Sequence, residues 1–183
     1  MPDRLYYTDS DEANALIASD PMALLVGFVL DQQVSVQKAF SGPLVLLERL
    51  GAIDAGTLAT ADLEPVFRAR PALHRYPGAM AVRVQDLCAA IVEDYDGHAE
   101  RVWTEAETGA DLKRRLLALP GIGDMKARSL LAVIGKRLDV RPPGWEEVAP
   151  THHTLGDVDS PEALEAYQAA KRAYKAELRA AKA

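Results

Sequence analysis

Residues 116–135, LLALPGIGDMKARSLLAVIG, contain the turn around which the predicted fold is organised. An apolar helical pattern precedes the turn, and a second run with the i, i+3, i+4, i+7 spacing of a buried helix face follows it. Between them, Pro120 disfavours a helical conformation at Leu119, and Gly121 permits a positive φ that other residues avoid. Two aspartates are positioned to cap these helices, Asp111 and Asp124. The stretch predicts two short helices packed across a tight turn.

The backbone of this turn has the chemistry of a phosphate site. Gly121 and Gly123 allow the amides around Ile122 to approach a ligand closely, just before a helix N-terminus, where the dipole favours an anion. Lys126 and Arg128 place positive charge nearby, as binding to a nucleic-acid backbone requires. The structural alternative is an ordinary helix-turn-helix connection that uses glycine as a cap.

Two segments resemble one protein family. LPGIGDMKA, residues 119–127, resembles the hairpin of the helix-hairpin-helix DNA glycosylase superfamily, whose Leu-Pro-Gly-hydrophobic-Gly turn grips one DNA strand by its phosphates. Residues 24–51, LLVGFVLDQQVSVQKAFSGPLVLLERLG, are similar to the early core helix and Gln-Gln-x-Ser-x turn of that superfamily, closest to its alkylated-base-removing branch. The resemblance covers roughly residues 22–141. It implies a two-lobed glycosylase-like fold and a role in base-excision repair on double-stranded DNA.

Apolar periodicity independently predicts an all-α fold of about eight to ten helices, because no stretch shows convincing period-two alternation. We expect residues 1–141 to form the glycosylase-like region, with the helix-hairpin-helix at 111–136. A loop at 142–160 and a C-terminal helix at 161–183 should follow. These parts should make one compact unit.

Capping and breaking residues predict further boundaries in the first half of the chain. Asp20-Pro21 should open an apolar helix from Met22 to Leu30, and Ser35 should cap the next helix, which we expect to break at residues 41–43, Ser-Gly-Pro. Thr60 should cap a small helix through Phe67. A helix of about five turns should end near Tyr95 and serve as scaffolding.

The charge distribution favours DNA binding although the net charge is −6. Residues 1–110 hold 8 basic and 17 acidic residues, whereas residues 111–141 hold 8 basic and 3 acidic ones. Positive charge is therefore concentrated on the hairpin, as a nucleic-acid interface requires. A merely solvated face formed by Lys113, Arg114 and Arg115 is the alternative interpretation.

Cysteine usage and hydropathy bound the setting of the protein. The single cysteine, Cys88, excludes a disulfide within the chain and the four-cysteine iron-sulfur cluster that some members of the superfamily carry. It lies near an apolar helix face, which favours a structural thiol. The longest apolar run, residues 22–30, is too short to cross a bilayer, and no leader is recognised. We expect a cytoplasmic protein that is monomeric and has no membrane partner.

Base recognition is predicted at the Gln-Gln turn. Enzymes that act on a base take it out of the duplex, and in the family that the chain resembles the wedge that fills the gap lies in this turn. Gln33 is the wedge candidate, supported by Gln32 and Ser35, because an amide can both donate to and accept from the estranged base. Two exposed glutamines that only solvate a helix end are the alternative.

The catalytic position of the family is not matched. Its aspartate lies about twenty residues past the second hairpin glycine, which here falls on Pro143-Gly144-Trp145. Glu146 and then Asp139 are the substitute candidates for the carboxylate that hydrolysis of a glycosidic bond needs. Lys126 is one position late for the amine nucleophile of a strand-cleaving enzyme, so a DNA glycosylase without strand cleavage is favoured.

Two other functions remain open, and one ion is expected. The chain is alternatively a catalytically inactive relative that binds DNA lesions or unusual DNA structures, or a helical protein-interaction module. The resemblance implies no organic cofactor but a potassium or sodium ion at the hairpin. Its ligands would be backbone carbonyls, with Leu119 and Ile122 as the nearest candidates.

Overall fold

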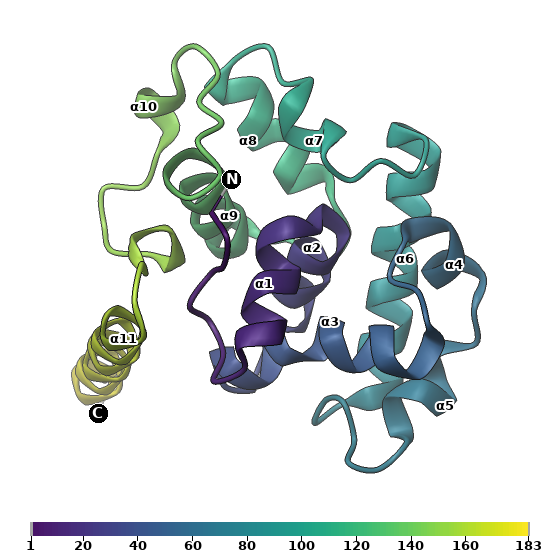
Figure 1. Ribbon diagram of the computed structural model, residues 1–183. Helices are drawn as coiled ribbons and strands as arrows, with labels where there is room; N and C mark the ends of the chain where they lie inside the picture. Colours follow the sequence, from purple (N-terminus) through teal and green to yellow (C-terminus); the bar gives the residue numbers. More distant parts are fainter. Residues whose placement is uncertain (1, 183) are drawn as a thin grey trace.

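The computed structural model describes residues 2–182, so the expectations for Met1 and Ala183 lie outside the described residues. These residues form eleven α-helices and one 3₁₀ helix, without a strand, which confirms the all-α class (Figure 1). In chain order they are α1 (Asp11–Ser19), α2 (Pro21–Leu30), α3 (Val36–Leu50), α4 (Ala55–Thr60), α5 (Leu63–Arg68), α6 (Pro77–Tyr95), α7 (Arg101–Thr104), α8 (Gly109–Ala118), α9 (Asp124–Lys136), α10 (Trp145–Val148), η1 (Leu155–Asp157) and α11 (Pro161–Lys182).

Helix α2 lies near the middle of the molecule, between α6 and α9 (Figure 1). Every residue of α2 after Pro21 is buried, and the Asp20 carboxylate caps it by accepting from the Ala23 amide at 2.9 Å. A Cβ on Gly27 would lie 2.5 Å from the Phe40 ring, so glycine is required for α3 to pack this closely. Within residues 2–182 no single helix is long and apolar enough to span a membrane, although the bent pair α1–α2 meets that test together.

Helices α8 and α9 form the predicted hairpin, but both predicted capping residues, Asp111 and Asp124, are wrong. The Thr108 hydroxyl caps α8 by accepting from the Asp111 amide at 3.0 Å, and Gly123 occupies the N-cap position of α9. Asp111 and Asp124 lie in the first turns instead, where a negative charge still suits the helix dipole. Asp111 also pairs with Arg115 at 3.0 Å.

The break predicted at residues 41–43 is wrong as well. Helix α3 continues through Pro43, although proline removes one intrahelical hydrogen bond. Packing outweighs this local cost, because Phe40 and its neighbours are buried and Gly42 lies directly against α2. A Cβ on Gly42 would lie 2.4 Å from a methyl carbon of Leu30.

Residues 53–70 form two short helices rather than the single helix predicted. Thr60 ends α4 instead of capping a helix, and the N-cap is Asp54, whose carboxylate accepts from the Thr57 amide at 2.9 Å. After α5 the chain is fixed by the Arg49 guanidinium, which donates to three backbone carbonyls, those of Val66, Ala69 and Pro71. The sequence therefore indicated a capped helix in this region but placed the cap at Thr60 instead of Asp54.

Helix α6 has the predicted five turns and packs against α4 and α5. Its buried face includes Val84, Leu87 and Ile91. Cys88 is buried beside them, and burial raises the pKa of its thiol to about 12. A thiol with so high a pKa stays protonated at neutral pH, as expected of a structural cysteine.

The segment 142–160 contains α10 and η1 rather than only a loop. Trp145 anchors it to α9, because the indole Nε1 donates to the Leu131 carbonyl at 3.1 Å and the ring covers Gly135. Gly156 in η1 then lies directly against the α9 backbone. The segment therefore runs along one side of α9 before α11 begins.

Gly135→Ala should destabilise the protein, because the added Cβ would lie 2.2 Å from ring carbons of Trp145, which is itself buried and hydrogen-bonded. We expect a loss of about 1–3 kcal/mol in the free energy of unfolding, as for other overpacked sites. Urea denaturation measures it. Gly56→Ala in α4 is the control, since an exposed helical glycine replaced by alanine should be neutral or stabilising. Equal stability of the two variants would contradict the packing described here.

Candidate nucleic-acid interface and adjoining cleft

The hairpin turn presents an open backbone to solvent. Gly121 has φ of +80°, and the Ile122 amide donates to the Leu119 carbonyl at 3.2 Å, which closes the turn. Ile122 is buried and anchors the turn, whereas Gly121 and Gly123 are exposed. A Cβ on Gly123 would meet no atom within 4 Å. Helix α9 begins there without a side-chain cap, so its first amides are available to an anion.

The two cations predicted to bind phosphate are engaged within the protein. Lys126 Nζ donates to the Val29 carbonyl at 3.1 Å and to the Gly121 carbonyl at 3.4 Å, and Lys126 is only partly exposed. Burial lowers the pKa of its ammonium, and the positive charge of Arg83 lowers it further. Arg128 pairs with Asp124 at 2.8 Å. The exposed part of the hairpin is therefore mainly its backbone.

One of the two carbonyls predicted to bind a monovalent cation, that of Leu119, already accepts a hydrogen bond within the turn. Leu119 O accepts from the Ile122 amide, and the adjacent Gly121 O accepts from the ammonium of Lys126. A protein ammonium thus already supplies a positive charge at this turn. Binding of potassium or sodium through Leu119 and Ile122 stays a prediction.

The Gln-Gln turn holds Gln33 outward. Gln33 is exposed with φ of +56°, and its Oε1 accepts from the Tyr76 hydroxyl at 3.1 Å. Gln32 accepts a hydrogen bond from Arg83, and Ser35 caps α3 by accepting from the Lys38 amide at 3.1 Å. Gln33 is thus positioned from outside its own segment, whereas Ser35 has a structural task.

His74 stabilises the Gln-Gln turn from the interior of the protein. Its Nδ1 accepts from the Tyr76 amide at 3.0 Å, so Nε2 carries the hydrogen that points to the Leu30 carbonyl, also at 3.0 Å. The imidazole is buried, and burial lowers its pKa, which keeps the ring neutral. The end of α2 and the Tyr76 side chain that holds Gln33 are therefore connected through one neutral histidine.

Neither carboxylate predicted as a substitute catalyst lies near the hairpin turn. Glu146 belongs to α10, which Trp145 attaches near the C-terminal end of α9. Asp139 follows α9 directly, with φ of +58° and an exposed side chain 3.9 Å from Arg141. Because α9 has 13 residues and rises about 1.5 Å per residue, its two ends are separated by roughly 18 Å.

A cleft of about 480 Å³ lies beside the hairpin end of α9. Three elements form it: the first turns of α9, the loop before η1, and α11. Its walls are largely apolar and aromatic, and His153 stacks obliquely on Tyr167 with 5.9 Å between ring centroids. The lining residues are Met125, Ser129, His152, His153, Thr154, Tyr167, Ala170, Lys171 and Tyr174. The volume lies within the range of small-molecule sites and exceeds that of one nucleobase.

Two hydrogen-bonding features mark this cleft. The hydroxyl of Ser129, which lines it, is buried and has no hydrogen-bond partner in the described part of the chain. Helix α11 is joined to the first turn of α3, which follows the Gln-Gln turn in the chain, by reciprocal amide bonds between Gln37 and Gln168, at 2.6 and 3.2 Å. The cleft therefore adjoins the start of α9, and Ser129, whose buried hydroxyl lacks a partner, belongs to its lining.

Asp31 lies where the end of α2 comes close to α9 and α11. It follows the last residue of α2, and its carboxylate is recessed. Burial raises its pKa, while the positive charges of Lys171, Lys126 and Lys175 act in the opposite direction. Among the described residues these lysines act on it at a distance, without a contact ion pair. Burial raises the pKa of Tyr167, which lines the cleft, and the charge of Asp31 adds to this rise.

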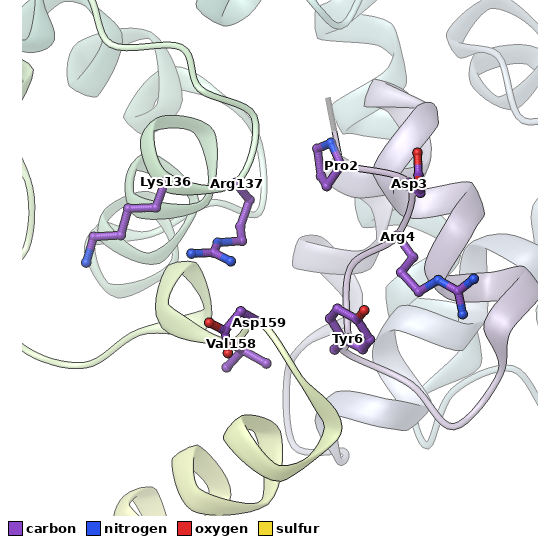
Figure 2. A pocket seen from close by; sticks show the side chains of 8 residues that line it. All are labelled: Pro2, Asp3, Arg4, Tyr6, Lys136, Arg137, Val158 and Asp159. Atoms are coloured by element: carbon purple, nitrogen blue, oxygen red, sulfur yellow. The ribbon is translucent and has the colours of Figure 1, made fainter.

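A second hollow, of about 240 Å³, lies at the other end of α9 (Figure 2). In Figure 2 the Arg137 guanidinium projects into it, with Pro2 and Tyr6 on the facing N-terminal segment. Acidic and basic residues both line it, and Lys136 is already paired with Asp157. This mixture favours no particular ligand charge.

Sequence reasoning missed the cleft because its residues come from segments that carried little signal. His152 and His153 have no third metal ligand near them in the sequence, and within residues 2–182 no group of three potential ligands is found. Tyr167, Lys171 and Tyr174 are spaced i, i+4, i+7, so they share one helix face. That spacing was the only available signal.

Comparisons with known proteins identify no family for this chain. A scan of family models, a search of curated proteins and a search of solved structures each find no match.

Asp31→Asn should be at least as stable as the unmodified protein at pH 7. Folding raises the pKa of Asp31 above its ordinary value of 3.8, so the ionised carboxylate opposes folding above the raised pKa. The advantage of the neutral variant should be complete at pH 7 and disappear as the pH falls through the raised pKa to below 3.8. Urea unfolding at pH 7 and pH 3.5 measures both. A clear loss of stability at pH 7 would show that the carboxylate is a structural necessity.

Proposed function

We propose that this protein binds double-stranded DNA through the α8–α9 hairpin and acts in base-excision repair. The observation that supports this proposal most strongly is the start of α9, which has no side-chain cap and follows an exposed glycine turn. Free amides and the helix dipole both favour a phosphate there. The concentration of basic residues in 111–141 supports the same surface electrostatically. The protein would act on DNA as a monomer.

We propose further that it is a monofunctional DNA glycosylase, which removes a damaged and most simply an alkylated base. Gln33, held outward by Tyr76, would occupy the gap left in the duplex, and the adjoining cleft is large enough for the displaced base. Strand cleavage would need a free amine as nucleophile. Lys126 is turned inward, and the Lys171 ammonium lies 5.6 Å from the centroid of the Tyr167 ring, in a cation–π contact.

The second candidate is a catalytically inactive relative that recognises DNA lesions or structures. It is favoured by the position of Glu146 and Asp139, which lie at the end of α9 away from the hairpin turn. A helical protein-interaction module is the third candidate. Exposed apolar side chains at Met125, Tyr174 and Leu178 are the observation that supports it.

Gly123→Glu should weaken binding to a duplex by about tenfold or more, because it places a charge against the phosphate while the Cβ meets open space. Gly56→Glu is the matched control: it makes the same change of charge on the exposed surface of α4, far from the hairpin. Fluorescence anisotropy with a labelled duplex, repeated at several salt concentrations, measures both. Equal affinity of the two variants, or binding insensitive to salt, would exclude the hairpin as the interface.

Base release provides the test of activity. Purified protein is incubated with duplexes that carry alkylated, deaminated or oxidised bases, and abasic sites are then revealed with alkali. We expect release from one class of lesion, with strand breaks only after alkali treatment. Tight binding to a lesion without release would establish the catalytically inactive candidate, and the absence of binding to any duplex would leave the protein-interaction module.

A further inference from the structure

We propose that Asp31 is the catalytic carboxylate of this protein and acts on the sugar of a nucleotide whose base occupies the cleft between α9 and α11. This inference rests on the proposed function, and it assigns the reaction to a residue that neither motif spacing nor the resemblance indicates. Its basis is the placement of a recessed carboxylate between the wedge candidate and the cleft.

The backbone around Asp31 directs the side chains of Asp31 and Gln33 to different surroundings. The Asp31 amide donates to the Gly27 carbonyl at 3.0 Å, so Asp31 stays attached to the end of α2. The Gln32 amide donates to the Leu30 carbonyl at 2.7 Å, and Gln33 then adopts a positive φ. The chain reverses within these residues. Gln33 is exposed as a result, whereas Asp31 is recessed only two residues earlier.

Burial disfavours the charge of the Asp31 carboxylate, and lysines at a distance only partly offset this, so a structural role for that charge is hard to find. A negative charge at a helix C-terminus is opposed by the helix dipole. Lys126 from α9 and Lys171 and Lys175 from α11 offset this effect, and Tyr167 is the remaining titratable group that α11 directs toward it. Their charges act without a contact ion pair among the described residues, so the carboxylate oxygens stay free to meet a ligand.

The elements around Asp31 determine how the sugar of the displaced nucleotide would approach it. Reciprocal amide bonds between Gln37 and Gln168 attach α11 to the first turn of α3, shortly after the Gln-Gln turn, and Lys126 ties the hairpin to the end of α2. A strand held by the hairpin and opened at Gln33 would therefore present the displaced nucleotide between α9 and α11. Its base would enter the cleft toward Tyr167, and its sugar would remain near the turn that carries Asp31.

The reaction at this place is hydrolysis of the N-glycosidic bond. The bond between C1′ and the base nitrogen breaks, and its electron pair leaves with the base. Asp31 stabilises the positive charge that develops on the sugar. The oxygen of a water molecule then bonds to C1′, and one water proton passes to Asp31, from which it reaches the departing base through solvent. Water is the only co-reactant, and no electron transfer occurs.

The test uses two duplexes that differ only in charge at the sugar. In one, the target nucleotide is replaced by a cationic pyrrolidine, which imitates the charge that develops at C1′; in the other, it is replaced by a neutral tetrahydrofuran. The unmodified protein should bind the pyrrolidine duplex at least about tenfold more tightly, as one charge-assisted contact in a recessed site predicts. A residue with a purely structural role would not move the ratio of the two affinities.

Asp31→Asn should reduce that preference to about twofold or less, because the amide keeps the shape and loses the charge. Glu146→Gln and Asp139→Asn are matched controls with the same loss of charge, and both should keep the full preference. Asp31→Asn should also slow base release by a factor of about 10² to 10⁴, within the range of general-base catalysis. If Asp31→Asn does not fold, as judged by its melting transition, Asp31→Ser replaces it.

The outcomes separate this inference from the proposed function. Binding of both duplexes without a preference, or a preference that survives removal of the Asp31 charge, overturns the role of Asp31 and leaves the DNA-binding hairpin in place. Failure to bind any duplex overturns the proposed function, and the role of Asp31 with it. A preference lost only in the Asp31 variants establishes the carboxylate.

Discussion

The C-terminal end of α2 lies inside the molecule, so the carbonyl oxygens that end a helix must find donors there. The donors come from two distant parts of the chain. Lys126 Nζ binds the Val29 carbonyl at 3.1 Å, and His74 Nε2 lies 3.0 Å from the Leu30 carbonyl. A buried carbonyl left without a donor costs about 1–3 kcal/mol, so both contacts constrain the fold. The hairpin and the loop that carries Tyr76 are thereby attached to the same helix end.

This convergence places the proposed functional groups next to one another. The chain leaves α2 at Asp31, reverses, and presents Gln33 to solvent, where the Tyr76 hydroxyl holds it. Because Lys126 is used for the helix end, the hairpin exposes mainly backbone amides rather than a lysine. Helix α11 is bonded to the first turn of α3 and forms one wall of the cleft. The proposed phosphate interface and the recessed carboxylate thus arise from one structural need.

Capping residues that act alone were predicted well, and those that compete were not. Ser35 was identified correctly, because its hydroxyl satisfies amides within three residues and no alternative lies nearby. Asp111 was chosen although Thr108 offers the same chemistry three residues earlier, and local rules do not rank the two. The break at residues 41–43 failed for another reason. The burial of Phe40 and the contact of Gly42 with α2 come from outside the helix and outweigh one missing hydrogen bond.

The sequence by itself determined the all-α class, the two helices of the hairpin and the glycine turn between them, because apolar periodicity and backbone freedom are properties of neighbouring residues. Only the tertiary structure decided what each charged side chain faces. Lys126 turns toward α2, Glu146 lies at the distant end of α9, and Asp31 is enclosed by elements more than ninety residues away. Burial and electrostatic environment depend on these long-range contacts, which residue spacing along the chain does not encode.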